Sequence, residues 1–190
     1  RTGRLTDSEW AELGKGLTFI EKLEQSGNFK IYEGCNTIET IAELVKREKP
    51  FMVVVDQLQQ LTSKTQKFDN NRARFSYMTR QLQLLAMEQN VAVWLACQVN
   101  RAANVNPDAR PTMDNLKESG SIEEDSDNVI LIHRDKKYEE EQMLKDIRAI
   151  ELSVAKQRSG ETTGEPITMI FNPNRFEFIK RVDGFAPNET

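Results

Sequence analysis

The sequence predicts an α/β fold in which helices cover a mainly parallel sheet. Two apolar runs, 51–55 and 91–97, lack the alternation of a half-exposed strand, so each predicts a strand buried on both faces. Between them, residues 72–90 carry apolar side chains at helical spacing, and the inward face consists of Phe75, Met78, Leu82, Leu85 and Ala86. A helix between two buried strands is typical of parallel strands joined by right-handed crossovers.

Two helices and a short strand are expected before the first of these runs. The first helix begins within Thr6–Glu9, where acidic residues fall in the first turn, and it ends at Ser26–Asn28. Its apolar residues recur at helical spacing, and we expect both tryptophans, Trp10 and Trp94, to lie in the core. The other expected elements here are a strand at 29–32 and a helix at 37–50.

The second half of the chain predicts a functional loop followed by antiparallel strands at the C-terminal end. The polar stretches 62–71 and 99–118 lack periodicity, and a loop as long as the second is usually functional. Gly160 and Gly164 lie in a turn between two strands, which predicts an antiparallel extension at the C-terminal end. The remaining expected elements are a helical turn at 121–126, a solvated excursion at 134–146, and strands at 129–133, 150–155, 167–171 and 175–179.

The composition excludes several classes of protein. The 190 residues suffice for one core, and we expect a single domain over residues 1–190. Two cysteines, Cys35 and Cys97, form no disulfide framework, and a lone histidine, His133, makes a zinc site untenable, so we interpret all three as structural. The net charge of -4 argues against broad non-specific nucleic-acid binding. No apolar run reaches the ~18 residues of a membrane span and no signal region is visible, so we expect a cytoplasmic location without membrane partners.

Polar residues follow both buried strands at the point where ligands bind in open α/β sheets. Asp56 comes directly after the first strand, where a carboxylate can hold a magnesium ion that bridges nucleotide phosphates. Gln98 follows the second strand, where an amide can hydrogen-bond a terminal phosphate or its attacking water. The alternative is that Asp56 caps a helix or turn and Gln98 is a structural amide. Two polar residues at equivalent strand ends favour the functional interpretation.

Two further segments carry groups that suit phosphates. Residues 115–127 contain a lysine, a glycine and small hydroxyl residues, whose backbone N–H groups can contact a nucleic-acid backbone. The acidic run 123–127 is interpreted as a solvated or capping face rather than a metal site. Lys156 and Arg158 end a strand before a glycine turn, where they could stabilise charge on a transferred phosphoryl group of a neighbouring subunit. The alternative is a pair of ordinary surface cations at a hairpin end.

The order and spacing of these motifs resemble the DnaB-type replicative DNA helicases over nearly the whole chain. FMVVVDQLQQL resembles the family's Walker B segment, and LACQVNR is similar to its Ser-Gln-Leu-Asn-Arg motif. AKQRSG is similar to the Lys-Gln-Arg-x-Gly element of the family, and the segments at 1–10 (RTGRLTDSEW) and 110–127 (RPTMDNLKESGSIEEDSD) also have counterparts there. Four motifs in register are far more specific than any one of them.

The resemblance implies a RecA-like core that serves as the C-terminal motor domain of a homo-hexameric DNA helicase, an enzyme that hydrolyses ATP or another nucleoside triphosphate with Mg²⁺. By position, Asp56 would hold the catalytic magnesium and Gln98 would sense the γ-phosphate. Lys156 and Arg158 would act in trans on the nucleotide of the adjacent subunit.

The resemblance also implies that the protein binds single-stranded DNA and moves along it. The DNA-binding residues would be Arg101, Lys117, Glu118 and Gly120. Primase and a helicase loader would be further partners, and the setting would be the cytoplasm of a bacterial cell or of a phage-infected host.

The chain also departs from the family pattern. Gln57 stands in place of Tyr, Cys97 of Ser, Val99 of Leu and Lys117 of Arg, and lysine lacks the planar fork of arginine. No GxxxxGK[ST] phosphate loop is present in the sequence, so we expect an N-terminally incomplete motor domain that is inactive alone. Two alternatives stay open: a non-catalytic module that binds DNA or a helicase, and a fragment of a RecA-type recombinase.

Overall fold

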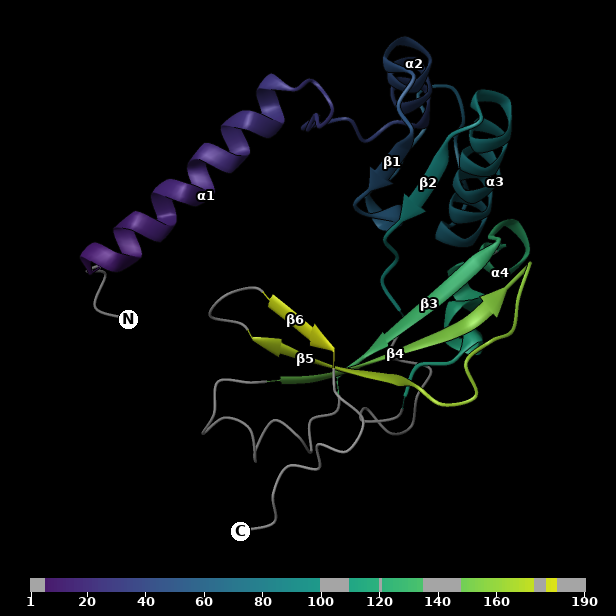
Figure 1. The fold of residues 1–190 in the computed structure, drawn as a ribbon. Coiled ribbons are helices and arrows are strands. Elements are labelled where there is room, and N and C mark those ends of the chain that lie inside the picture. The colour runs from purple at the N-terminus through teal and green to yellow at the C-terminus, as the bar shows by residue number, and fades with distance from the viewer. Residues whose placement is uncertain (1–5, 100–109, 120, 135–147, 173–176, 181–190) are drawn as a thin grey trace. The chain divides into compact units, whose positions relative to one another are not determined.

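The computed structural model describes residues 6–99, 110–119, 121–134, 148–172 and 177–180. The chain divides into two compact units, one ending at Cys35 and the other beginning at Asn36 (Figure 1). Each unit is described by itself. None of the helices in the described ranges is long and apolar enough to cross a membrane.

The first unit consists of helix α1, Asp7–Gln25. The predicted helix start is confirmed, because Thr6 and Glu9 form a capping box: the Glu9 amide donates to Thr6 Oγ1 at 3.3 Å and the Thr6 amide donates to Glu9 Oε2 at 2.7 Å. No residue of α1 is buried, so the expected core position of Trp10 is wrong, and its side chain is 59% exposed. A single helix has no second layer in this unit against which to bury an apolar stripe.

The strand expected at 29–32 is also absent from the structure. These residues form neither helix nor strand, and Ile31 is 76% exposed. A strand exists only with a hydrogen-bonded neighbour, and within the described residues these four have none. Apolar character alone therefore gave a wrong prediction for this segment.

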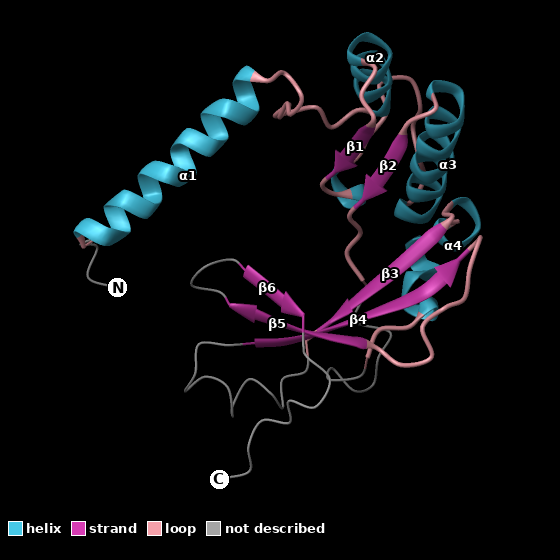
Figure 2. Cartoon of the chain, viewed as in Figure 1, coloured by secondary structure: helices cyan, strands magenta, loops and turns pink. Residues whose placement is uncertain are grey.

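The second unit begins with two helices packed on a pair of parallel strands (Figure 2). Strand β1, Met52–Val55, pairs in parallel with β2, Ala92–Leu95, and α3, Asn71–Gln89, connects them. Helix α2, Ile38–Glu48, precedes β1 and packs against α3. A short 3-10 helix, η1 at Leu58–Gln60, follows β1. The predicted helix–strand–helix–strand order is confirmed.

One continuous core joins these elements. The side chains of Leu58 and Met78 are fully buried, and the inward residues of α2 and α3 surround them. The helices end where Lys49 and Asn90 adopt left-handed backbone conformations, with φ of 47° and 50°. The remaining members of this part of the core are Ile38, Ile41, Val45, Val55, Leu61, Phe75, Leu82, Leu85 and Val91.

Only one face of the β1–β2 pair belongs to this core. Val55 is buried, whereas Val54 is 70% exposed and Trp94 is 57% exposed. The prediction of strands buried on both faces is therefore wrong, as is the core position of Trp94. The reason is geometric: successive residues of a strand point to opposite faces, and within the described part of the second unit the helices lie on one face only.

The remaining strands form a four-stranded antiparallel sheet of order β3-β4-β5-β6. The expected antiparallel extension at the C-terminal end is confirmed, and so is the α/β fold class. Strand β3 pairs with β4 rather than with the parallel pair. Of the polar stretch 99–118, the part from Met113 onward forms a 3-10 helix, and 100–109 lies outside the described residues, as does almost all of 134–146. The elements are η3 Met113–Ser119, α4 Ile122–Asp125, β3 Asn128–His133, β4 Arg148–Gln157, β5 Ile167–Asn172 and β6 Glu177–Lys180.

Candidate functional site

Asp56 and Gln98 leave the same end of the parallel pair. Asp56 directly follows β1, and Gln98 lies three residues beyond the end of β2; both are exposed. The chain segments stay side by side past the strands, because the Ala96 amide donates to the Val55 carbonyl at 3.0 Å and the Leu58 amide donates to the Ala96 carbonyl at 2.9 Å. The structure thus places both of these predicted site residues at the same end of the strand pair.

A third polar residue, Gln59, joins this end of the sheet. Its Nε2 donates to the Gln98 carbonyl at 3.0 Å, and the Gln98 amide donates to Gln59 Oε1 at 3.1 Å. Sequence reasoning missed Gln59, because the adjacent glutamines at 57 and 60 present the same local chemistry. What distinguishes Gln59 from these two glutamines is its contact with Gln98, which lies 39 residues further along the chain.

Lys156 holds the C-terminal end of the short helix α4. Its Nζ donates to the backbone carbonyls of Glu123 and, at 2.7 Å, Ser126. A lysine at this place satisfies carbonyls that a helix leaves without intrahelical partners. The predicted trans-acting cation is therefore half-buried and bonded within its own chain in this structure.

Arg158 makes a comparable set of contacts two residues further along the chain. Its Nη1 lies 2.6 Å from Asp127 Oδ1, and its amide donates to the Asp127 carbonyl at 2.9 Å. Both side chains of the ion pair are largely exposed, so the pair is readily exchanged for another partner. Lys156 and Arg158 thus lie at the same strand end, as predicted, and both contact the α4–β3 connection.

The predicted DNA-contacting residues are only partly described. Lys117 and Glu118 belong to η3, whereas Arg101 and Gly120 lie outside the described residues. The segment before them is held firmly, because Arg110 pairs with the buried carboxylate of Glu151 through two bonds of 2.6 and 2.8 Å.

Helix α4 is tied to α3 by a hydroxyl–carboxylate cluster. Asp125 Oδ2 accepts from Thr79 Oγ1 at 2.6 Å and from Ser121 Oγ at 2.5 Å, and Thr79 is buried. Asp125 therefore plays a structural part, because it joins α4 to α3. Among the described residues, no group of three or more His, Cys, Asp or Glu side chains is placed to hold a metal ion.

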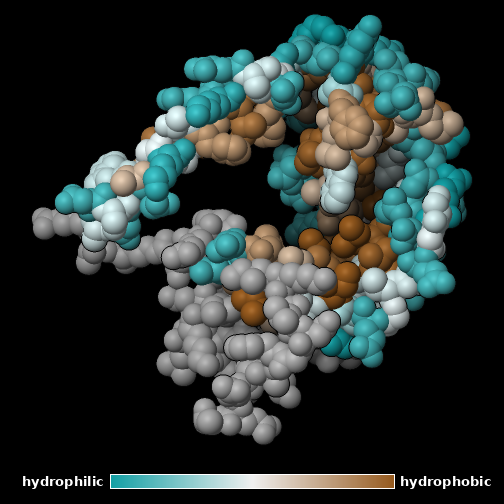
Figure 3. Space-filling view, in the orientation of Figure 1, coloured by the Kyte–Doolittle hydropathy of each residue, from teal (hydrophilic) through white to brown (hydrophobic). Residues whose placement is uncertain are grey.

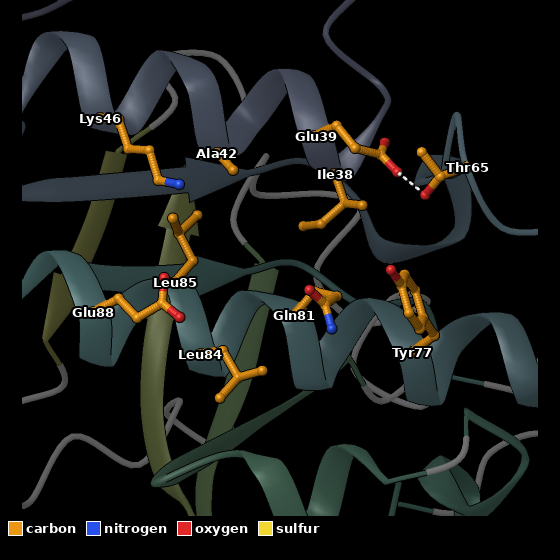
Figure 4. A pocket seen from close by; sticks show the side chains of 10 residues that line it. All are labelled: Ile38, Glu39, Ala42, Lys46, Thr65, Tyr77, Gln81, Leu84, Leu85 and Glu88. Atoms are coloured by element: carbon orange, nitrogen blue, oxygen red, sulfur yellow. Dashed lines mark hydrogen bonds between the residues drawn. The ribbon is translucent and has the colours of Figure 1, made fainter.

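A groove lies between α2 and α3 in the second unit (Figure 4). Glu39 at its rim accepts hydrogen bonds from the hydroxyls of Ser63 and Thr65 and from the amide of Lys64, the last at 3.0 Å. Burial by itself would raise the pKa of Glu39, but these hydrogen bonds outweigh it and lower the pKa to about 2. Neither Asp56 nor Gln98 lines this groove.

The second unit thus has a parallel strand pair with helices packed on one face and with Asp56 and Gln98 at its carboxyl end, the end at which open α/β sheets bind ligands. Residues 1–180 match the family described as the DnaB-like helicase C-terminal domain, and the chain belongs to this family.

Relatives of known identity agree with this assignment. The chain is 30% identical over 186 residues to the replicative DNA helicase DnaC of Bacillus subtilis, covering 95% of this chain and 40% of that protein. It is 32% identical over 188 residues to the replicative DNA helicase DnaB of Mycobacterium leprae, covering 95% of this chain and 30% of that protein. The chain therefore spans less than half the length of these curated relatives.

Solved structures show the same fold. One of them, described as an ATPase domain, superposes with a TM-score of 0.65 at 27% identity, over 77% of this chain and 52% of that one. A DnaB-like replicative helicase, described together with its interactions with primase, gives a TM-score of 0.75 at 25% identity over 96% of this chain and 44% of that one. The expected α/β, RecA-like class is confirmed.

Proposed function

We propose that this chain is the motor part of an ATP-driven, hexameric replicative DNA helicase that translocates on single-stranded DNA and unwinds duplex DNA. Residues 1–190 would act within a single RecA-like motor domain. The observation that carries the proposal is the placement of Asp56 and Gln98 at one end of the parallel strand pair, because this end of an α/β sheet is where nucleotides bind. Membership of the helicase family supports it.

The residues present fit a magnesium–nucleotide complex. Magnesium takes oxygen ligands and usually needs only one or two protein carboxylates beside water and phosphate, so the exposed carboxylate of Asp56 suffices as the protein ligand. Mg²⁺–ATP bound here would supply the phosphoryl group whose transfer to water would drive movement. The amide of Gln98 can donate to a terminal phosphate oxygen and thereby distinguish the triphosphate from the diphosphate.

Lys156 and Arg158 are proposed to act on the nucleotide of an adjacent subunit. Their position at the end of β4 supports this, since cations at a strand end can reach across an interface to the charge that develops on a phosphoryl group. To do so, Arg158 would exchange the exposed carboxylate of Asp127 for phosphate oxygens.

The DNA substrate, the hexameric assembly and the protein partners are proposed from the same family membership. We propose that Arg101, Lys117, Glu118 and Gly120 contact the backbone of single-stranded DNA, that the subunits form a homo-hexamer, and that primase and a loader bind the ring. The solved DnaB-like helicase described with primase supports the primase partner. A bacterial cell or phage-infected host would be the setting, since the relatives named above are bacterial.

The decisive experiment is DNA-stimulated ATP hydrolysis by the helicase that contains this domain. An Asp56→Ala substitution should lower turnover by about 100-fold, the scale on which a charge-stabilising group in an active site contributes. Asp69→Ala is the matched control, because Asp69 is likewise exposed but lies in the loop before α3. Undiminished turnover with Asp56→Ala would overturn the proposal.

A further inference from the structure

The side chain of Gln59 continues the hydrogen-bonded pairing of the two parallel strands beyond their last backbone hydrogen bond. The regular ladder ends at the Val55–Leu95 pair, and the Leu58 amide adds one bond to the Ala96 carbonyl at 2.9 Å. The carboxamide of Gln59 then takes the place of a peptide group opposite Gln98. It donates to the Gln98 carbonyl and accepts from the Gln98 amide, at 3.0 and 3.1 Å.

This reciprocal pair fixes the backbone of Gln98 on both sides of its Cα atom. Two hydrogen bonds to one residue restrict the direction of its Cα–Cβ bond, because that direction follows from the backbone. Gln98 lies outside the regular strand and its side chain is exposed, so these bonds restrain its backbone where the ladder has ended, between Cys97 and Val99, which pack against the core.

Gln59 is itself held from the opposite side. Arg74 on α3 donates from Nη2 to the Gln59 carbonyl at 3.3 Å and to Asn71 Oδ1 at 3.1 Å. The half-buried Gln59 side chain also lies 3.5 Å from Cys97 Sγ. A chain of contacts therefore runs from the first turn of α3 through Gln59 to Gln98.

We infer that Gln59 is a positioning residue that orients Gln98 toward the terminal phosphate of the bound nucleotide. The inference rests on the proposed function, in which Gln98 senses that phosphate. Gln59 touches no substrate: it acts through the backbone of Gln98, and its effect on hydrolysis disappears when the Gln98 side chain is removed.

The first arm of the test is kinetic and uses the helicase that contains this domain. Gln59→Met keeps the side-chain volume and removes both bonds, and it should lower kcat about tenfold to a hundredfold, the scale of a small misplacement of a reacting group, with KM for ATP unchanged. The matched control is Gln60→Met, because Gln60 is the exposed neighbour in the same short helix. Gln59→Glu keeps the acceptor and loses the donor, and it should give a smaller loss of kcat.

A double-mutant cycle separates positioning from a merely structural role. The variant Gln59→Met/Gln98→Ala should be no slower than Gln98→Ala alone, because the two residues act as one unit. If the two losses multiply, or if Gln59→Met turns over like the wild type while Gln98→Ala is slow, the inference is overturned and the proposed function stands. If Gln98→Ala turns over normally, the sensor role falls and the inference falls with it.

The second arm needs no activity and is done on this chain. The Gln98 amide should be protected from hydrogen exchange in the wild type and in Gln60→Met, and it should lose that protection in Gln59→Met and keep it in Gln59→Glu. Thermal unfolding of each variant shows whether the domain remains folded. An unprotected Gln98 amide in the wild type would overturn the inference whatever the kinetics show.

Discussion

At the scale of single residues, Glu39 has the clearest electrostatic signature. It lies in the first turn of α2, where a negative charge is favoured, and it accepts bonds from the Ser63–Thr65 loop. The cluster joins α2 to the segment that follows β1 and η1. The hydrogen bonds of this cluster are strong only while Glu39 is ionised, because a carboxylate accepts charge-assisted hydrogen bonds.

A Glu39→Gln substitution should lower the free energy of unfolding at pH 7 by about 1–3 kcal/mol, the scale of hydrogen bonds to a charged group. The pKa of Glu39 is lowered from 4.5 to about 2 in the folded chain, so between these values the unfolded chain binds more protons and stability rises with pH. The difference between wild type and variant should therefore be complete above pH 4.5 and vanish as pH falls through about 2. Urea unfolding at a series of pH values measures it.

The control for this prediction is Glu43→Gln on the exposed face of the same helix. It should leave stability within about 0.5 kcal/mol of the wild type, as surface substitutions do. A Glu39→Gln difference that stays constant down to pH 2 would contradict the role given to the ionised carboxylate.

At the scale of elements, helix α3 connects the two parallel strands and supplies the centre of the core. Met78 on its inner face is fully buried, whereas Met87 on the same helix is 71% exposed. The two methionines therefore test burial with the same side chain on the same helix.

Met78→Ala should lower the free energy of unfolding by about 2–5 kcal/mol, because it removes fully buried atoms and leaves a cavity in the core. Met87→Ala should change it by no more than about 0.5 kcal/mol. Denaturant unfolding measures both. Equal losses in the two variants would show that α3 is not packed with this face inward.

The helices and the strands from β1 onward were predictable because their signals are local, whereas the expected strand at 29–32 did not form. Caps and apolar spacing determine α1, α2 and α3, and these follow from residues close in sequence. The exposure of Val54 and Trp94 was not predictable, since a short apolar run looks the same whether one or both faces of a strand are covered.

The candidate site was predictable to the same extent. Asp56 and Gln98 could be placed at strand ends from the apolar runs that precede them. The contacts of Gln59, the Lys156 contacts with α4 and the Arg158–Asp127 pair depend on segments about 30 to 40 residues apart, so no local pattern contains them. Strand pairing brings the partners together in all three cases.

At the scale of the whole molecule, apolar surface is exposed on the parallel strand pair of the second unit, as it is along α1 of the first unit. Figure 3 shows hydrophobic atoms exposed over β1 and β2, and the residues that contribute include Phe51, Met52, Val54 and Trp94. Parallel sheets are ordinarily covered on both faces, and soluble monomers rarely expose contiguous apolar patches of large size.

This surface should make the chain associate with a second copy of itself. Sedimentation velocity should show a mass that rises with protein concentration for the wild type. The double variant Val54→Thr/Trp94→Thr should stay monomeric over the same range, because it removes exposed apolar area while keeping residues that suit a strand.

Two controls identify the surface responsible. Ile31→Thr removes an even more exposed apolar side chain from the first unit and should leave association unchanged if the effect belongs to the strand pair. Arg158→Ala should also leave it unchanged, because association through the sheet face does not use the cations proposed to reach a neighbouring nucleotide. Loss of association with Arg158→Ala, and none with the strand variant, would instead assign self-assembly to the β4 strand end, where the helicase ring is proposed to form.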